Sequence, residues 1–114
     1  MEIIDLTERD WPRVEEYANV GARAASVAFG RGDAYVRLLR LDAGGWVEPH
    51  EAGLGQLFVP VVGTGWVSEG SQRAAIRVGQ AAYFSRGVVQ AKGSDTGMVA
   101  LLIQVVDLDL GGTP

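Results

Sequence analysis

The sequence contains no cysteine among its 114 residues. This absence excludes disulfide bonds, thiolate catalysis and metal sites built on cysteine. Long apolar runs are also absent, and none approaches the roughly 20 residues that a membrane-spanning helix requires. The first residues, Met1 to Asp5, are acidic and lack the basic and apolar segments of a secretion signal. We therefore expect a cytoplasmic protein that does not enter membranes.

Positive charge is scarce and scattered. Lys and Arg together number 10 against 14 Asp and Glu, which gives a formal net charge of -4, and all but one of the positive residues are Arg. Proteins that bind nucleic acids or anionic membrane surfaces gather Lys and Arg in a run or on one face. The sequence therefore predicts neither kind of partner.

Glycine, by contrast, is abundant, and the 16 glycines fall between short apolar runs rather than in one linker. Short strands separated by regular turn signals are typical of an all-β sandwich or barrel. The expected strands lie at residues 34–41, 57–62, 66–68, 74–78, 81–84 and 98–106. The expected turns lie at residues 31–33, 42–45, 63–65, 69–71 and 93–95.

The two ends depart from this pattern. Asp10 could cap one short helical turn that runs through Pro12 to Tyr17, although an irregular arm would fit the same residues. The sequence contains no linker that would divide the chain. We expect one barrel domain over residues 1–110, with residues 1–20 as an N-terminal arm, and a disordered tail over residues 111–114.

One spaced motif lies in the middle of the chain. Gly44 is followed after five residues by His50, and Gly63 closes the motif. This pattern resembles the first conserved motif of the cupin superfamily, which reads Gly, five residues, His-x-His, three or four residues, Glu, six residues and Gly. Every interval is preserved, but Ala52 stands in place of the second His and Gln56 in place of the Glu.

A second motif follows in the order that the cupin superfamily shows. Gly79 and Gly87 match its glycines, whereas Ser85 replaces its Pro and Gln90 replaces its His. The resemblance implies a cupin-type double-stranded β-helix, which is a jelly-roll barrel. It also implies a homodimer, joined through sheet edges or through an exchanged N-terminal segment, for which Ile3–Leu6 is the candidate. The glycines of both motifs are expected at turns that need a positive φ or a close approach.

The metal site of the superfamily is not expected here. In metal-bearing cupins the two His, the Glu and the later His hold a divalent transition metal, and this chain offers His50, Ala52, Gln56 and Gln90 at those positions. A methyl group coordinates nothing, and neutral amides are poor ligands for such a metal. We therefore predict no metal and no other cofactor. Glu48 would lie on the same face of the strand as His50 if the strand were regular, but Pro49 between them indicates a bulge.

The same positions suggest a redesigned pocket. The residues predicted to line it are His50, Gln56, Gln90, Phe58 and Trp46, and the last two are also candidates for simple packing. Buried amides need hydrogen-bond partners, which a small polar ligand would supply. Arg37 and Arg40 have opposite parity in one apolar run, so one of them is expected to face inward, where it would bind a carboxylate.

Three functions remain open at this point. The first is a metal-free module that binds a small polar or acidic molecule inside the barrel. The second is an enzyme in which His50 and Glu48 form an acid–base pair, as the resemblance to metal-independent cupin isomerases and epimerases implies, because histidine exchanges protons near neutral pH. The third is a structural dimer with an empty pocket. Fold alone does not decide among them.

Overall fold

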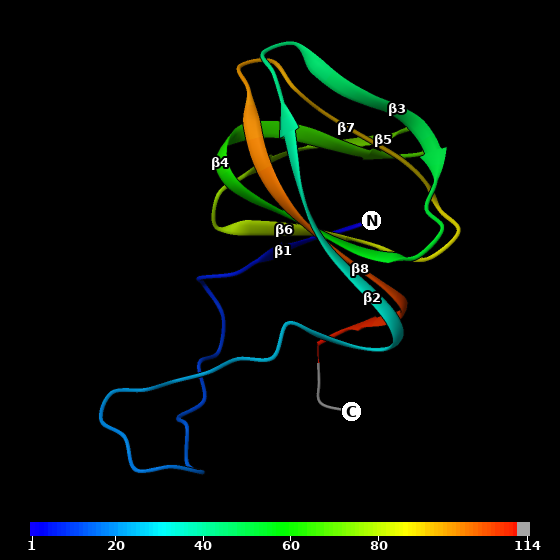
Figure 1. The fold of residues 1–114 in the computed structure, drawn as a ribbon. Coiled ribbons are helices and arrows are strands. Elements are labelled where there is room, and N and C mark those ends of the chain that lie inside the picture. The colour runs from blue at the N-terminus through cyan, green and yellow to red at the C-terminus, as the bar shows by residue number, and fades with distance from the viewer. Residues whose placement is uncertain (112–114) are drawn as a thin grey trace.

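The computed structural model describes residues 1–111, which form an 8-stranded antiparallel barrel without a helix (Figure 1). The strands are β1 (Glu2–Asp5), β2 (Ala28–Leu41), β3 (Gly45–Glu51), β4 (Gly55–Glu69), β5 (Gln72–Arg77), β6 (Gln80–Phe84), β7 (Val89–Ser94) and β8 (Met98–Leu110). The expectation of an all-β chain is confirmed. Within the described residues no helix is long and apolar enough to cross a membrane.

Strand β4 is shared by the two halves of the barrel. Residues 55–63 pair with β6 and β8, whereas residues 64–69 pair with β5 and β7. One half therefore has the order β1-β6-β4-β8-β2, and the other half contains β3, β7, β4 and β5. The inner faces of the two halves enclose the core.

The segment from Gly63 to Gly65 is the corner at which β4 passes from one half to the other. The sequence predicted a turn between two strands here, and that prediction was wrong because the chain remains paired on both sides of the segment. Gly63 has a φ of 81°, and a Cβ atom on it would overlap the carbonyl oxygen of Gly97. Only glycine meets both conditions without strain. The other three motif glycines, Gly44, Gly79 and Gly87, also have positive φ values, as predicted.

Besides β1, which lies within the predicted arm, two strands were missed because their residues are not typical of strands. β3 contains Pro and two Glu, and β7 contains Gln, Lys, Gly and Ser. β7 pairs with β3 on one side and with β4 on the other, and pairing on both sides outweighs weak strand propensity. Two expected turns also shift: residues 31–33 lie at a bulge inside β2, and residues 93–94 belong to the end of β7.

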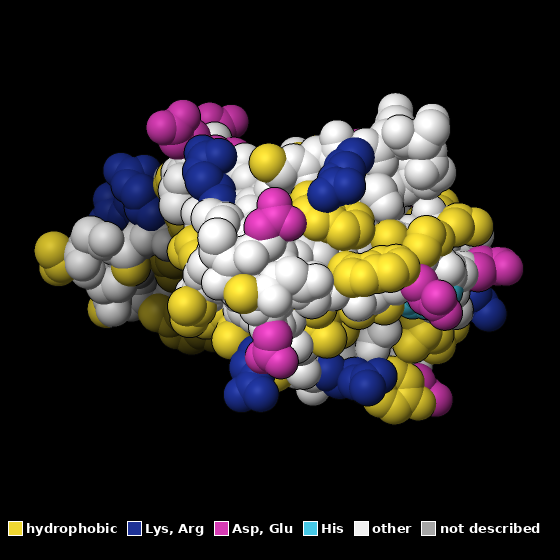
Figure 2. Space-filling model, turned by 90° about the horizontal axis from the view of Figure 1, so that it is seen from above, with side chains coloured by type: hydrophobic (Ala, Val, Ile, Leu, Met, Phe, Trp, Pro, Cys, Tyr) yellow, Lys and Arg dark blue, Asp and Glu magenta, His cyan; other side chains and the backbone are white. Residues whose placement is uncertain are grey.

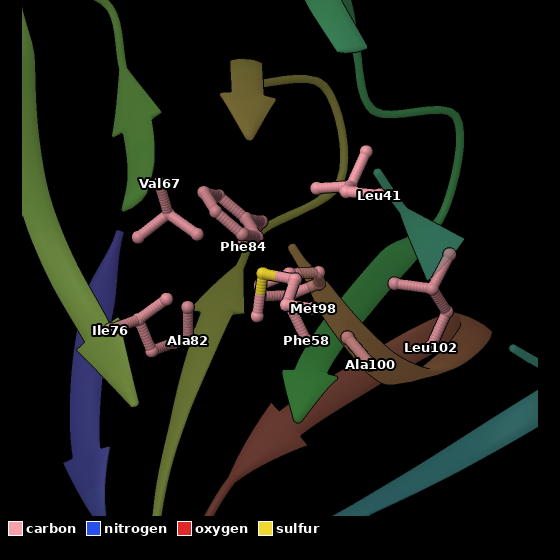
Figure 3. Packing of buried hydrophobic residues seen from close by; sticks show 9 residues of the cluster. All are labelled: Leu41, Phe58, Val67, Ile76, Ala82, Phe84, Met98, Ala100 and Leu102. Atoms are coloured by element: carbon pink, nitrogen blue, oxygen red, sulfur yellow. The ribbon is translucent and has the colours of Figure 1, made fainter. Parts of the chain in front are cut away.

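The hydrophobic core forms two clusters on opposite faces of the larger sheet. Figure 3 shows the interior cluster, in which side chains from several strands point toward one another. Its members are Leu41, Phe58, Val67, Ile76, Ala82, Phe84, Met98, Ala100 and Leu102. The second cluster contains Leu57, Ala81, Val105 and Leu108, and Leu6 and Val27 from the two ends of the N-terminal arm pack against it. The arm therefore contributes to a core outside the barrel.

The N-terminal arm spans residues 6–27 and extends away from the barrel (Figure 1). The helical turn predicted from Asp10 to Tyr17 does not form. The backbone N–H of Val14 instead donates to Ala22, and that of Ala24 donates to Pro12, which leaves these groups unavailable for helical hydrogen bonds. The arm also begins later than predicted, because β1 pairs with β6 of its own chain. Of the predicted tail, residues 112–114 lie outside the described residues.

Candidate functional site

Strand β7 directs three polar side chains into the barrel. Alternation along a strand places Gln90, Lys92 and Ser94 on one face, and all three are buried. Lys92 stands in register with Val47 of β3 and Val67 of β4, both of which pack in the interior cluster. This alignment identifies the inner face of β7 and places a glutamine and a lysine inside the barrel.

His50 is exposed near the end of β3, and two hydrogen bonds hold its ring. Its Nδ1 lies 3.0 Å from the backbone oxygen of Glu48, and its Nε2 lies 3.3 Å from Nε2 of Gln90. Because a carbonyl oxygen only accepts, Nδ1 carries the proton of the neutral ring, and Nε2 accepts from the Gln90 amide. Gln90 thereby fixes the imidazole at the edge of the interior. The structure brings together these two predicted site residues.

Glu48 does not form the predicted acid–base pair with His50. The register of β3 against β7 shifts between Val47 and His50, so β3 has one residue more than its partner here. Pro49 predicted a bulge here. The bulge breaks the regular alternation that would have placed the side chains of Glu48 and His50 on the same face. Glu48 reaches the imidazole only through its backbone carbonyl. No ion pair joins their side chains in the described part of the chain.

Gln56 is a second buried amide on the inner face. It is 3% exposed and lies in register with Phe84 of β6 and Gln104 of β8. Its Oε1 accepts a 3.3 Å hydrogen bond from Nε2 of Gln104. Among residues 1–111, neither its own Nε2 nor Oε1 of Gln90 has a hydrogen-bond partner. The interior therefore contains one unpaired amide donor and one unpaired amide acceptor.

Lys92 is the one cationic side chain that is buried in the described part of the chain. It is the single lysine of the chain and is 3% exposed. Its Nζ lies 5.0 Å from the ring centroid of Phe58 and 5.7 Å from that of Phe84. Burial disfavours the charged form and lowers the pKa of the ammonium to about 8. The sequence analysis did not predict that Lys92 belongs to the site. The one feature that distinguishes it in the sequence is that every other cationic side chain is an arginine.

Solved structures share this arrangement of strands. A cupin superfamily protein from Desulfitobacterium hafniense aligns with a TM-score of 0.62 and 14% identity over 83% of this chain and 95% of that chain. The chain adopts the cupin fold. An RmlC-like cupin from Shewanella frigidimarina aligns with a TM-score of 0.61 and 15% identity over 64% of this chain and 66% of that chain.

The likeness extends to a predicted oxalate decarboxylase from Thermotoga maritima. The TM-score is 0.58 at 16% identity, and the alignment covers 62% of this chain and 64% of that chain. No protein-family model matches the sequence, and no curated protein matches it. The comparisons therefore establish the cupin fold. The function has to be inferred from the residues of the site.

The residues at the cupin metal positions do not fit a transition metal. Nδ1 of His50 faces a carbonyl oxygen, Ala52 presents a buried methyl group, and Oε1 of Gln56 already accepts from Gln104. Within residues 1–111 no three His, Asp or Glu side chains gather where they could hold an ion. A transition-metal site needs three or four N, O or S ligands in fixed geometry. This donor set does not supply them.

Trp46 and Phe58 occupy different environments. Phe58 is fully buried in the interior cluster, where its ring contacts Lys92. Trp46 is 60% exposed and lines a surface hollow of about 270 Å³ together with Pro49 and Trp66. Its prediction as a residue lining the barrel was wrong, because its neighbour Val47 is the one that faces the core.

Arg37 lies in register with Leu102 of the interior cluster, but neither Arg37 nor Arg40 is buried. Both are exposed, and Nε of Arg40 lies 3.5 Å from the carboxylate of Asp42 at the surface. The sequence predicted that one of the two arginines faces inward, and Arg37 does share the face of Leu39 and Leu41, which pack in or against the interior cluster. It is nevertheless exposed, so it is not buried in the barrel. Basic and acidic side chains are interspersed on the face seen in Figure 2. The buried cationic side chain is Lys92.

Proposed function

We propose that the chain is a metal-free binding module that holds a small polar molecule inside the barrel. The observation that supports this proposal is the pair of unpaired amide atoms, Nε2 of Gln56 and Oε1 of Gln90. A buried polar group without a partner costs roughly 1–3 kcal/mol. A ligand with an acceptor and a donor at the separation of these two atoms would satisfy both groups. The acid–base alternative has no comparable support, because the carboxylate of Glu48 does not reach His50.

Thermal unfolding in the presence of small polar probes tests this proposal. L-lactate, lactamide and propane-1,2-diol each contain an acceptor and a donor within a few atoms. A ligand that binds only the folded chain stabilises it by about 2.7 kcal/mol at a free concentration of one hundred times Kd. We expect at least one of these probes to raise the melting temperature. The variant Gln90→Leu should lose that increase, whereas the exposed-site control Gln72→Leu should keep it.

A failed screen would have a clear meaning. If none of the three probes raises the melting temperature, the binding proposal is overturned and the chain is better regarded as a structural module. If a probe stabilises Gln90→Leu as strongly as the unmodified chain, the ligand binds elsewhere and the interior site is wrong.

We also propose that a second copy of this chain covers strand β2. This strand pairs only with β8, so its other edge offers unpaired backbone groups. Its central residues are exposed on both faces, and Val36 and Leu38 are 67% and 72% exposed. Antiparallel pairing of β2 with β2 of a second copy is self-complementary about a two-fold axis. Such pairing would cover the edge and both apolar side chains.

The substitution Leu38→Glu tests the dimer. A carboxylate at the centre of the contact would have to be buried next to its own copy across the two-fold axis, which is strongly unfavourable. We expect the unmodified chain to have the mass of a dimer by light scattering and the variant to have the mass of a monomer. Thr96→Glu, at an exposed position in the turn before β8, is the matched control and should remain dimeric. A monomeric unmodified chain would contradict the proposal.

A further inference from the structure

The ammonium group of Lys92 is a buried cation that no carboxylate of residues 1–111 balances. The ion pairs of the described residues join the α-amino group of Met1 to Glu69 and Arg40 to Asp42. Glu69 is the acidic residue of β4 that lies in register with Gln90, and its Oε1 is 2.7 Å from the nitrogen of Met1. The titratable residue of β3 in the same row is His50, whose ring nitrogens face Glu48 and Gln90. Buried charges in proteins are normally paired.

We propose that Lys92 is the charge partner of the ligand, and that the ligand is a small carboxylate that also contains a hydrogen-bond donor. This inference rests on the proposed function and specifies the chemical class of the molecule that binds. A carboxylate would supply the missing counter-ion for the ammonium. The aromatic rings on which Lys92 lies cannot do so, because a ring offers only a weak cation–π attraction.

The position of Gln56 favours a carboxylate. Gln56 precedes Phe58 by two residues on the same face of β4 and lies directly opposite Phe84. Its side chain is therefore adjacent to the two rings that Nζ of Lys92 contacts. Its unpaired Nε2 is a donor, so a carboxylate in this place would accept hydrogen bonds from both Lys92 and Gln56. Hydrogen bonds that involve a charged group are shorter and stronger than neutral ones.

The position of Gln90 accounts for the donor on the ligand. Gln90 and Lys92 are neighbours on the inner face of β7. The unpaired Oε1 of Gln90 is an acceptor, so it would bind a hydroxyl or amino group that sits close to the carboxylate. Apolar side chains of the interior cluster, Phe58 and Phe84 among them, occupy the same interior (Figure 3). The ligand class is therefore a short hydroxy or amino acid of few heavy atoms.

Matched pairs of acids and amides separate charge from shape. L-lactate and lactamide have nearly the same shape, as do glycolate and glycolamide, but only the acids are charged at pH 7. We expect each acid to bind with a Kd roughly tenfold or more below that of its amide, measured by calorimetric titration at constant ionic strength. Lys92→Met should bind the acid no better than the amide, whereas the exposed-cation control Arg37→Met should bind the acid as the unmodified chain does.

The pH dependence gives an independent readout. Because the pKa of Lys92 is lowered to about 8, the free site loses its charge above that pH and must take up a proton when a carboxylate binds. We expect the Kd for L-lactate to rise by up to roughly tenfold per pH unit above about pH 8. The weaker binding of lactamide should not change over this range.

The outcomes distinguish this inference from the proposed function. If lactamide binds in a manner that requires Gln90 but L-lactate binds no more tightly, the interior site stands and the role of Lys92 is overturned. If Lys92→Met binds L-lactate as tightly as the unmodified chain, the role of Lys92 is likewise overturned. If neither acid nor amide binds, both proposals are wrong. Circular dichroism of Lys92→Met will show that a loss of binding is not a loss of the fold.

Discussion

Replacing Lys92 with Met should raise the free energy of unfolding at pH 7 by about 3 kcal/mol. Most substitutions of buried residues destabilise a protein, so the sign of this effect is unusual. Burial lowers the pKa of Lys92 from 10.5 to about 8, and each pKa unit corresponds to about 1.36 kcal/mol. At pH 7 this free-energy cost destabilises the folded chain, because the ammonium remains charged although it is buried beside the rings of Phe58 and Phe84. Methionine has a similar length and no charge, and it adapts to irregular space.

The stabilisation by Lys92→Met should depend on pH in a defined direction. Below the folded-state pKa of about 8, Lys92 is charged in both the folded and the unfolded chain, so the full cost is present. Between about pH 8 and 10.5 the unfolded chain holds the proton more tightly, and the free energy of unfolding therefore rises with pH. The difference between variant and unmodified chain should be largest below about pH 8 and should vanish as the pH approaches 10.5.

Urea denaturation of both proteins at about pH 7 and at about pH 10 measures this difference, and other titrating groups cancel because both proteins contain them. Arg37→Met removes an exposed cation of similar length and should change the free energy of unfolding by less than about 0.5 kcal/mol at either pH. A variant that is less stable than the unmodified chain at pH 7 would contradict the prediction. It would show that the ammonium has a compensating partner in the folded chain.

The expected loss of stability caused by Lys92 supports a role for this residue in binding. The other cationic side chains of the chain are all arginine, and every one of them except the partly buried Arg9 is exposed. The buried position therefore holds the one lysine at a place where we expect methionine to be more stable. Residues that reduce stability without local compensation are typical of functional sites. Stability and acid binding should consequently respond to Lys92→Met in opposite directions.

The sequence was sufficient to predict the fold because the fold depends on spacing. The intervals from Gly44 through His50 to Gly63 place a turn, an inward side chain and a corner at fixed separations along the chain. Glycine at Gly63 and Gly44 is required by the backbone itself, so it leaves a signal that does not depend on neighbours in space. The bulge at Pro49 was visible for the same reason, since proline cannot donate to a ladder.

The site was less predictable because it depends on which face of each strand turns inward. Trp46 and Val47 are adjacent, and nothing local decides which of them meets the core. β7 was not recognised as a strand, and without it the inward position of Lys92 could not be inferred. Gln90 was found only because it stands at a motif position. Pairing with β3 and β4 buries Lys92, and such partners are distant in the sequence.

Replacing Gly63 with Ala should lower the free energy of unfolding by about 3 kcal/mol or more. Two separate penalties combine at this corner of β4. A side chain at a φ of 81° costs about 1–2 kcal/mol. The new Cβ would also overlap the carbonyl of Gly97 and the backbone of Met98, and the strain of such overpacking is about 1–3 kcal/mol. These backbone atoms lie at the paired start of β8 and directly before it, and they cannot move aside as a flexible side chain could.

Two other glycines separate these penalties. Gly44 has a φ of 80° and open space around its Cβ position, so Gly44→Ala should cost only about 1–2 kcal/mol. Gly53 has neither a positive φ nor a close neighbour, so Gly53→Ala should change stability by less than about 1 kcal/mol, with stabilisation favoured. Urea denaturation should therefore rank the loss of stability as Gly63→Ala, then Gly44→Ala, then Gly53→Ala. Equal losses for Gly63→Ala and Gly44→Ala would show that β4 and the turn before β8 can separate at the corner, and that the two halves of the barrel are joined less rigidly than their shared strand indicates.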